Sequence, residues 1–274
     1  MTTDARQAPD DGAVRVAALQ TAGTPGDVHA NLAELDRAAA DAVARGASLL
    51  ITPEMFLTGY EIGPAAADLA RQDLDGPTGA IAARHGIDLV VGLPEADGDR
   101  LYNTASVFAA DGALTARYRK THLFGDLDRA VFTAGDELVT TFEHRGLKVA
   151  LLVCYDVEFP ETVRAAALAG AHLVAVPTAQ MEPFSFVADV LIRTRAWENQ
   201  VYVAYVNHDG DEGGELRYVG GSSLVAPDGA VLDRAAHGTA LLVADLRRDV
   251  VEAGQRANPY LLDRRPPHAP VAAG

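Results

Sequence analysis

The side chain in this sequence best suited to act as a nucleophile is that of Cys154, the only cysteine of the chain. It follows an apolar run at 148–153 that is typical of a buried strand, and Pro160 can open a helix shortly afterwards. A thiol at a strand-to-helix turn is held rigidly and can face a cleft. Taken alone, such a cysteine also fits the description of a small buried hydrophobe, so its neighbours decide the chemistry.

Two further residues offer complementary chemistry at the ends of strand-like segments. Glu54 follows the apolar run 48–52 and a proline, and partial desolvation there would raise its pKa and make it a better base near neutrality. Lys120 closes the basic segment 117–120 and, turned inward, could counter the negative oxygen that develops when a carbonyl is attacked. Taken alone, Glu54 also fits an ordinary loop acid, and the segment with Lys120 also fits a solvated basic face. Together with a thiol they are sufficient for acyl transfer.

The elements that must hold these residues are short strands alternating with helices. The predicted strands are 14–19, 48–52, 88–93, 104–109, 148–153, 172–176, 201–206, 222–226 and 240–245. The predicted helices are 27–46, 160–169 and 183–199. In the first, Asp27 is the cap, Gly46 is the stop, and Leu32, Leu35, Ala39 and Val43 share a face. In the third, Phe186, Val190 and Trp197 lie on one side.

Two segments in the first half of the chain are similar in sequence to two segments in the second half. Residues 46–53 are similar to 170–177, and residues 106–113 are similar to 223–230, where Asp-Gly pairs suit tight hairpins. Two similar halves predict two sheets packed face to face with helices outside. Chance similarity between α/β units is the alternative interpretation.

Composition limits the classes of function. The 274 residues suffice for one domain, with a core at about 14–250 and flexible termini that include a loose leader at 1–12 and a proline-rich tail at 264–270. The net charge of −15 argues against nucleic acid and anionic membrane surfaces as partners. The first residues lack the pattern of a signal peptide, and no apolar run is long enough to span a bilayer, so we expect a cytoplasmic protein. The eight histidines are scattered without ligand-like pairing, so we expect no metal.

Three segments, 53–60, 118–124 and 154–161, together resemble the nitrilase superfamily of carbon–nitrogen hydrolases, in the family's order. The similarity runs from about residue 14 to residue 245. It implies an α/β fold of the four-layer αββα sandwich type, and a catalytic triad of Glu54, Lys120 and Cys154. It further implies that no cofactor is needed and that the protein is a homodimer or larger homo-oligomer.

The resemblance also suggests which residues surround the triad. It places the backbone N–H of Tyr155 at the oxyanion, and Tyr60 and Gln180 beside the substrate. Amidases of the family often carry a second glutamate eight residues after the lysine, where this chain has Asp128. The shorter carboxylate either orients Lys120 or the substrate less directly, or is a surface loop acid.

The expected function is hydrolysis of a small aliphatic or ω-amino carboxamide, such as 5-aminopentanamide, to carboxylate and ammonia through a thioester. The acidic residues at 209–215 could attract a substrate ammonium or form a solvated loop. The alternatives are an N-carbamoyl-amine hydrolase and a nitrilase. A non-catalytic binding homologue is disfavoured by the complete triad. We expect Cys154→Ala, Glu54→Gln and Lys120→Ala each to nearly abolish turnover and to leave the fold intact.

Overall fold

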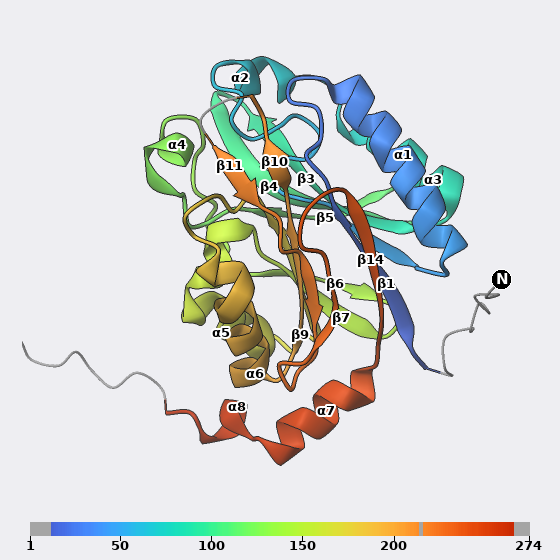
Figure 1. Cartoon of the computed structure of the whole chain (residues 1–274), viewed down its shortest axis with the longest axis vertical. Coiled ribbons are helices and arrows are strands. Elements are labelled where there is room, and N and C mark those ends of the chain that lie inside the picture. Colours follow the sequence, from blue (N-terminus) through green and yellow to red (C-terminus); the bar gives the residue numbers. More distant parts are fainter. Residues whose placement is uncertain (1–11, 214–215, 266–274) are drawn as a thin grey trace, which may run out of the picture.

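The computed structural model describes residues 12–213 and 216–265. Two six-stranded sheets pack against each other, and helices cover their outer faces (Figure 1). The predicted α/β four-layer αββα sandwich is therefore confirmed. The leader predicted at 1–12 lies almost entirely outside the described residues, as does most of the proline-rich tail.

The first sheet has the order β14-β1-β2-β3-β4-β5. Its strands are β1 (Val14–Gln20), β2 (Leu49–Ile51), β3 (Asp88–Asp97), β4 (Arg100–Phe108), β5 (Leu114–Arg119) and β14 (Ala240–Leu246). Strands β1, β2 and β3 are parallel, and β4, β5 and β14 run antiparallel to their neighbours. The helices on this half are α1 (Val28–Ala44), α2 (Ala65–Leu69) and α3 (Asp75–His85).

The second sheet has the order β13-β12-β9-β8-β7-β6. Its strands are β6 (Thr140–His144), β7 (Leu147–Leu151), β8 (Leu173–Thr178), β9 (Tyr202–Asn207), β12 (Ser223–Val225) and β13 (Val231–Arg234). A separate ribbon pairs β10 (Asp209–Asp211) with β11 (Arg217–Val219). The remaining helical segments are α4 (Gly125–Arg129), the 3₁₀ turn η1 (Cys154–Glu158), α5 (Pro160–Leu168), the π-helical η2 (Val187–Leu191), α6 (Ile192–Asn199), α7 (Arg248–Ala257) and α8 (Tyr260–Asp263).

The internal repeat is visible strand by strand. Parallel strands β7, β8 and β9 take the places of β1, β2 and β3, and hairpin strands β12 and β13 take those of β4 and β5. The antiparallel strands β14 and β6 hold the same position in the two sheets. Both predicted Asp-Gly pairs lie in the hairpin turns, one between β4 and β5 and the other between β12 and β13. The repeat is thus a property of the fold and not a chance similarity.

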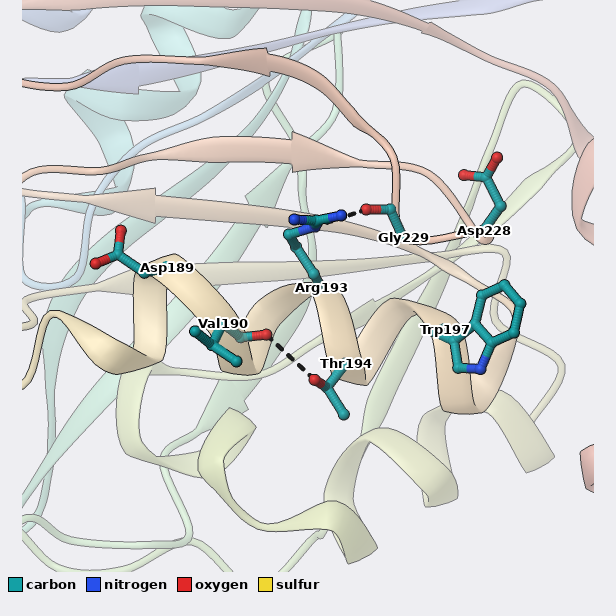
Figure 2. A pocket seen from close by; sticks show the side chains of 7 residues that line it. All are labelled: Asp189, Val190, Arg193, Thr194, Trp197, Asp228 and Gly229. Atoms are coloured by element: carbon teal, nitrogen blue, oxygen red, sulfur yellow. Dashed lines mark hydrogen bonds between the residues drawn. The ribbon is translucent and has the colours of Figure 1, made fainter.

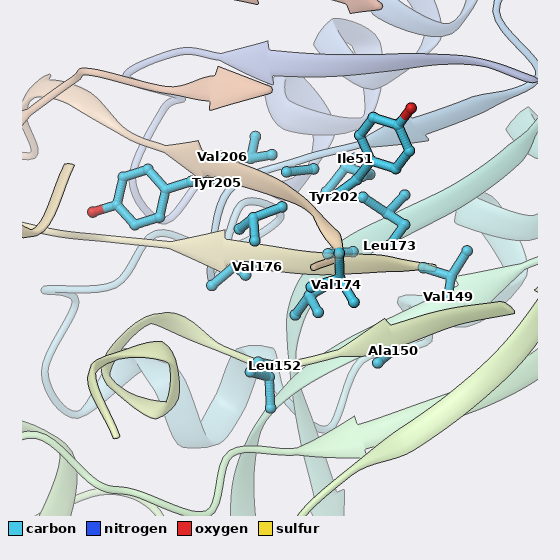
Figure 3. Packing of buried hydrophobic residues seen from close by; sticks show 14 of the residues in the cluster. Ile51, Val149, Ala150, Leu152, Leu173, Val174, Val176, Tyr202, Tyr205 and Val206 are labelled. Atoms are coloured by element: carbon cyan, nitrogen blue, oxygen red, sulfur yellow. The ribbon is translucent and has the colours of Figure 1, made fainter. Parts of the chain in front are cut away.

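Alternation along the strands divides the core into layers. In the first sheet, Val16 and Ile51 belong to the cluster that joins the two sheets, whereas Ala17 and Leu50 pack with the helices. The facing sheet contributes Val149 and Leu173, which pair with each other on one face of that sheet, to the same cluster (Figure 3). Because both faces of the central strands are covered, their sequences are nearly continuous apolar runs.

Two predicted apolar helix faces are partly or wholly exposed. The buried stripe of α1 includes Leu35, Ala39 and Ala42, but Val43 is 40% exposed because it lies beyond the edge of this stripe. In the segment predicted as one helix at 183–199, a π-helical turn precedes α6, and the apolar residues predicted on one side are exposed. They are Phe186, Val190 and Trp197. The prediction also missed β5, β6, β10, β11 and β13.

A buried polar bridge ties the two sheets at one end. The His144 imidazole on β6 contacts the Ser48 hydroxyl at 2.9 Å and the Asp88 carboxylate at 2.7 Å, and both partners belong to the first sheet's half. Burial by itself would raise the pKa of Asp88. The hydrogen bond and charge of His144, the Ala110 backbone N–H and the charge of Arg145 together outweigh burial, so the net pKa is lowered. Within the described ranges, no helix is long and apolar enough to cross a membrane.

Candidate active site

Three segments that leave the sheets bring Glu54, Lys120 and Cys154 together. Glu54 lies three residues after β2, Lys120 directly follows β5, and Cys154 opens η1 after β7. The Lys120 Nζ donates to Glu54 Oε1 at 2.8 Å. The charge of Glu54 is also a cause of the altered pKa of the Cys154 thiol, which places these two groups within electrostatic range. The three residues selected from the sequence are therefore neighbours in space.

The backbone is bent sharply at two of these segments. Cys154 has φ +47° and Met55, directly after Glu54, has φ +52°, which is the left-handed region that residues other than glycine rarely adopt. Gly92 on β3 lies against the Glu54 segment so closely that a Cβ would stand 2.1 Å from the Pro53 carbonyl oxygen. Local strain of this kind is held by the surrounding structure and is concentrated at functional sites.

The Glu54 carboxylate is fully buried and bonded on one side only. Oε1 accepts hydrogen bonds from Lys120 Nζ and, at 2.7 Å, from Asn103 Nδ2. Oε2 has no hydrogen-bond partner of normal geometry in the part of the chain that the structure describes. Burial raises the pKa of Glu54, and the positive charge of Lys120 opposes that shift. A carboxylate with a raised pKa and one unoccupied oxygen can accept and return a proton.

The ammonium group of Lys120 lies between two carboxylates. Besides Glu54, it donates to Asp128 Oδ2 at 2.7 Å, and Asp128 also accepts from the Tyr60 hydroxyl at 2.8 Å and the Phe124 backbone N–H at 2.8 Å. Burial alone lowers the pKa of Lys120, but the surrounding negative groups, led by Glu54, raise it well above its ordinary value. Lys120 is thus a fixed cation.

Asp128 is fully buried, so its interpretation as a surface loop acid is wrong. Helix α4 folds inward because its first residues follow the Phe124 turn, and this brings the shorter aspartate within direct hydrogen-bond distance of Lys120. The expectation that Asp128 orients Lys120 less directly is also wrong, since its carboxylate accepts from the ammonium group itself.

The Cys154 thiol keeps a small opening, with 6% of the residue exposed. Its Sγ lies 4.0 Å from Gln180 Oε1. Burial and then the charge of Glu54 raise the pKa of the thiol well above its ordinary value, so the resting thiol is neutral near pH 7. It becomes a nucleophile only when a base removes its proton during attack.

Asp156 joins the turn of the cysteine to the segment of the lysine. Its buried carboxylate accepts from the Val153 backbone N–H at 3.1 Å, the Tyr118 hydroxyl at 3.0 Å and the Thr121 hydroxyl at 2.9 Å. The His122 Nδ1 also lies 2.9 Å from Asp156 Oδ1. The relative position of Cys154 and Lys120 is thereby fixed.

The other predicted residues are placed around the triad. Tyr155 belongs to the first turn of η1, where N–H groups lack partners inside the helix, and its ring packs against Phe124 at 5.3 Å. The backbone N–H of Gln180 donates to Asn207 Oδ1 at 2.7 Å, which anchors Gln180 beside the thiol. The ring of Tyr60 faces the ammonium group of Lys120, whose Nζ is 5.7 Å from the ring centre.

The acidic segment at 209–215 is not simply a solvated loop. The Glu212 carboxylate accepts from the backbone N–H groups of Tyr60, at 2.9 and 3.0 Å, and of Glu61, at 2.6 Å. It therefore holds the segment that carries Tyr60. Asp209 accepts from the Gly238 backbone N–H, and Glu215 lies outside the described residues.

Two residues at the site were missed by sequence reasoning, Asn103 and His208. Asn103 is a polar residue in the middle of the buried strand β4, and that break in an apolar pattern was the available signal. His208 is buried and contacts the Glu54 carbonyl oxygen at 2.7 Å. No signal in the sequence connects residue 208 to residue 54, because only the packing of the two sheets brings them together.

A hollow of about 360 Å³ on the outer surface is separate from the triad. It lies along α6 and the turn between β12 and β13 (Figure 2). Its lining residues are Asp189, Val190, Arg193, Thr194, Trp197, Asp228 and Gly229. Glu54, Lys120 and Cys154 are not among them, so this hollow is a feature separate from the cluster that those three residues form.

The chain belongs to the carbon–nitrogen hydrolase family, whose model matches residues 15–256. This match covers all three segments of the triad and establishes the chain as a hydrolase of the nitrilase superfamily. The resemblance inferred from the three sequence motifs is therefore confirmed.

Relatives named for an activity are similar to this chain over most of their length. An (R)-stereoselective amidase from Pseudomonas sp is 37% identical over 257 residues, covering 92% of either chain. The chloroplastic omega-amidase of Arabidopsis thaliana is 32% identical, covering 87% of this chain and 69% of its own. A protein described as a hydrolase in the pqqF 5′ region of Pseudomonas protegens is 46% identical, covering 92% of this chain and 90% of its own.

Solved structures of an amidase from Nesterenkonia sp. AN1 have the same fold. A cysteine-to-alanine mutant superposes with a TM-score of 0.86 at 38% identity, covering 94% of this chain and 96% of the other. A glutamate-to-glutamine mutant, with the same TM-score, identity and coverage, carries the acetamide moiety of fluoroacetamide on its active-site cysteine. Another structure of the cysteine-to-alanine mutant holds butyramide.

Proposed function

We propose that this protein is a cysteine-dependent amidase that hydrolyses a small aliphatic or ω-amino carboxamide through a thioester. The observation that carries the proposal is the position of the chain's single cysteine beside a buried carboxylate and a buried ammonium group. The active-site cysteine of the Nesterenkonia amidase supports it, because Cys154 is the only residue of this chain that could play that part.

In the acylation step, Glu54 takes the thiol proton as Sγ attacks the amide carbonyl carbon. Oε2 is the oxygen available for that proton, since both donors to the carboxylate lie on Oε1. Lys120 and the Tyr155 backbone N–H stabilise the oxyanion that forms, and losing one such donor in a comparable site costs about 3–4 kcal/mol. Glu54 then protonates the leaving nitrogen, the C–N bond breaks and ammonia departs.

In the deacylation step, water replaces ammonia and Glu54 acts as a base again. The water loses its proton to Glu54 as it attacks the thioester carbonyl, and the proton returns to the sulfur as the C–S bond breaks. Carboxylate is released and the thiol is restored. The negative groups around Lys120, led by Glu54, hold its pKa well above its ordinary value, so it enters each step as a cation.

The surroundings of the triad support an uncharged acyl group as the first substrate to test. Apolar and aromatic side chains cluster next to it: Met55, Tyr60, Phe132, Ala179, Met181 and Tyr218. The nearby Glu212 carboxylate is already bonded to backbone N–H groups, which reduces its capacity to bind a substrate ammonium. An ω-amino amide remains the second substrate class.

A panel of compounds tests the proposal. We expect ammonia release from simple aliphatic amides such as butyramide, measured against 5-aminopentanamide, an N-carbamoyl amine and a nitrile. Release of carbon dioxide together with ammonia would identify an N-carbamoyl-amine hydrolase, and consumption of the nitrile would identify a nitrilase. Turnover of the nitrile or of the carbamoyl amine alone, with every amide left intact, would contradict the proposal.

We further propose that the protein forms a homo-oligomer. Support comes from Phe186, Val190 and Trp197, which lie on the outer side of η2 and α6 and are 64%, 45% and 43% exposed. Clustered exposed apolar side chains are typical of interaction surfaces. Light scattering should give at least twice the mass of one chain, and replacing Trp197 with a glutamate should lower it. A monomer across the micromolar range would overturn this proposal.

A further inference from the structure

Asn103 touches both the carboxylate and the lysine of the triad. Its side chain Nδ2 donates to Glu54 Oε1 at 2.7 Å, and its backbone carbonyl accepts from the Lys120 backbone N–H at 2.9 Å. Asn103 lies on β4 between β3 and β5, paired with Pro94 on one side, while its neighbour Thr104 pairs with Arg119 on the other. The middle strand of this three-stranded segment, β4, therefore contributes a residue to the cluster of Glu54, Lys120 and Cys154.

The bond from Asn103 makes the Glu54 carboxylate asymmetric. A carboxylate oxygen has two lone pairs in its plane, and on Oε1 the two donors are Lys120 Nζ and Asn103 Nδ2. A proton placed on Oε1 would have to displace one of them. Oε2 has no such donor among the residues described, so it is the oxygen that can take a proton without breaking a bond.

Placing an asparagine at this buried position leaves one of its polar atoms without a hydrogen bond. Asn103 is fully buried, and its Oδ1 has no hydrogen-bond partner within residues 12–213 and 216–265. Burying an unsatisfied amide oxygen is unfavourable, and an apolar residue at this position would avoid it. Among the residues that the structure describes, the side chain makes one hydrogen bond, to Glu54, so the benefit of an asparagine here lies in that contact.

We propose that Asn103 is a positioning residue that fixes the orientation of Glu54 and reserves Oε2 for proton transfer to and from the thiol. The proposal rests on the proposed function, in which Glu54 is the base. Asn103 does not touch the reacting atoms; it acts through Glu54. Its removal should lower the rate of the chemical steps and leave substrate binding nearly unchanged.

The test compares Asn103→Leu and Asn103→Asp with Thr104→Val. Thr104 is also fully buried on β4, but its side chain points to the opposite face of the sheet. Thr104→Val loses the hydroxyl's contacts with the Leu93 carbonyl at 2.7 Å and the Ser106 hydroxyl at 3.3 Å. With butyramide, we expect kcat of Asn103→Leu to fall roughly 100-fold, as for other misplaced catalytic groups, with KM close to wild type. Thr104→Val should keep kcat within about 3-fold of wild type, because its side chain lies on the other face of the sheet and makes no hydrogen bond to Glu54, Lys120 or Cys154.

The pH profile separates positioning from a loss of stability. A hydrogen bond to the charged form of a carboxylate favours that form, so removing it raises the pKa of Glu54. Because the base must be ionised, the acid limb of kcat/KM should move to higher pH in Asn103→Leu, and further in Asn103→Asp, which adds a negative charge. The other titratable groups near Glu54 are the same in every variant, so they do not account for a difference between the pH profiles. The groups near its side chain are Lys120, Asp128, Cys154, Tyr60, Tyr205 and Tyr218, and His208 contacts its backbone carbonyl oxygen.

Alkylation of Cys154 by iodoacetamide gives a readout that does not depend on the substrate. Its rate should fall in Asn103→Leu and stay unchanged in Thr104→Val, since the thiol needs a correctly placed base. If folded Asn103→Leu and Asn103→Asp both match Thr104→Val in kcat, pH profile and alkylation, the positioning role is overturned. If instead the wild-type protein releases no ammonia from any amide, it is the proposed function that fails.

Discussion

Cys154→Ala should lose ammonia release by at least about 10⁴-fold, with a melting temperature close to that of the wild type. Removing a nucleophile takes away the covalent route entirely and leaves only what binding and oxyanion stabilisation can supply. The fold should survive because alanine is smaller, apolar and able to occupy the buried position without an unpaired polar group. Ammonia assays with butyramide and thermal unfolding at the same pH measure the two effects.

The matched control is an alanine at a buried position outside the triad, Ser48→Ala, which breaks the bridge between the sheets at the His144 contact. It should lower the melting temperature and retain turnover. Substantial amidase activity in purified Cys154→Ala would show that another group is the nucleophile.

Lys120→Ala should abolish turnover and also destabilise the protein strongly. The ammonium group is completely buried between Glu54 and Asp128, at 2.8 and 2.7 Å. Removing one partner of a buried ion pair leaves uncompensated charge, here two carboxylates facing each other, and typically costs about 3–5 kcal/mol. This changes the expectation from sequence that the fold would remain intact. Denaturant unfolding at neutral pH measures the loss.

Lys148→Ala is the control, because Lys148 is the only other lysine of the chain and its exposed Nζ contacts a backbone carbonyl at 3.2 Å. That variant should behave as the wild type in both assays. A Lys120→Ala protein as stable as Lys148→Ala would mean that the buried charges are not paired as the structure has them.

The places of Glu54 and Cys154 after strands could be predicted because each follows a recognisable apolar run, whereas the strand before Lys120 was missed. The selection of Lys120 needed the resemblance to one superfamily. The mutual distances of the three residues could not be predicted, since they depend on how the two sheets pack.

The features that could not be predicted from the sequence mostly involve polar residues. Strand β5 has threonine and arginine at alternate places, so it resembles a surface segment although Tyr118 is fully buried. Asp128 gave no sign of burial, because its partners Lys120 and Tyr60 come from different segments. Val43 was placed on the buried face by its spacing, yet the helix turns that position outward. Each case depends on tertiary contacts that periodicity does not encode.

The central claim is that the sulfur of Cys154 becomes acylated during turnover. Its most direct test is acid quenching of the wild-type protein during hydrolysis of its best amide, followed by peptide mass spectrometry. The account predicts one acyl group on the peptide that contains residue 154, lost on treatment with hydroxylamine. Rapid ammonia release from an unmodified cysteine, with no acyl adduct at any quench time even for Glu54→Gln, would contradict it.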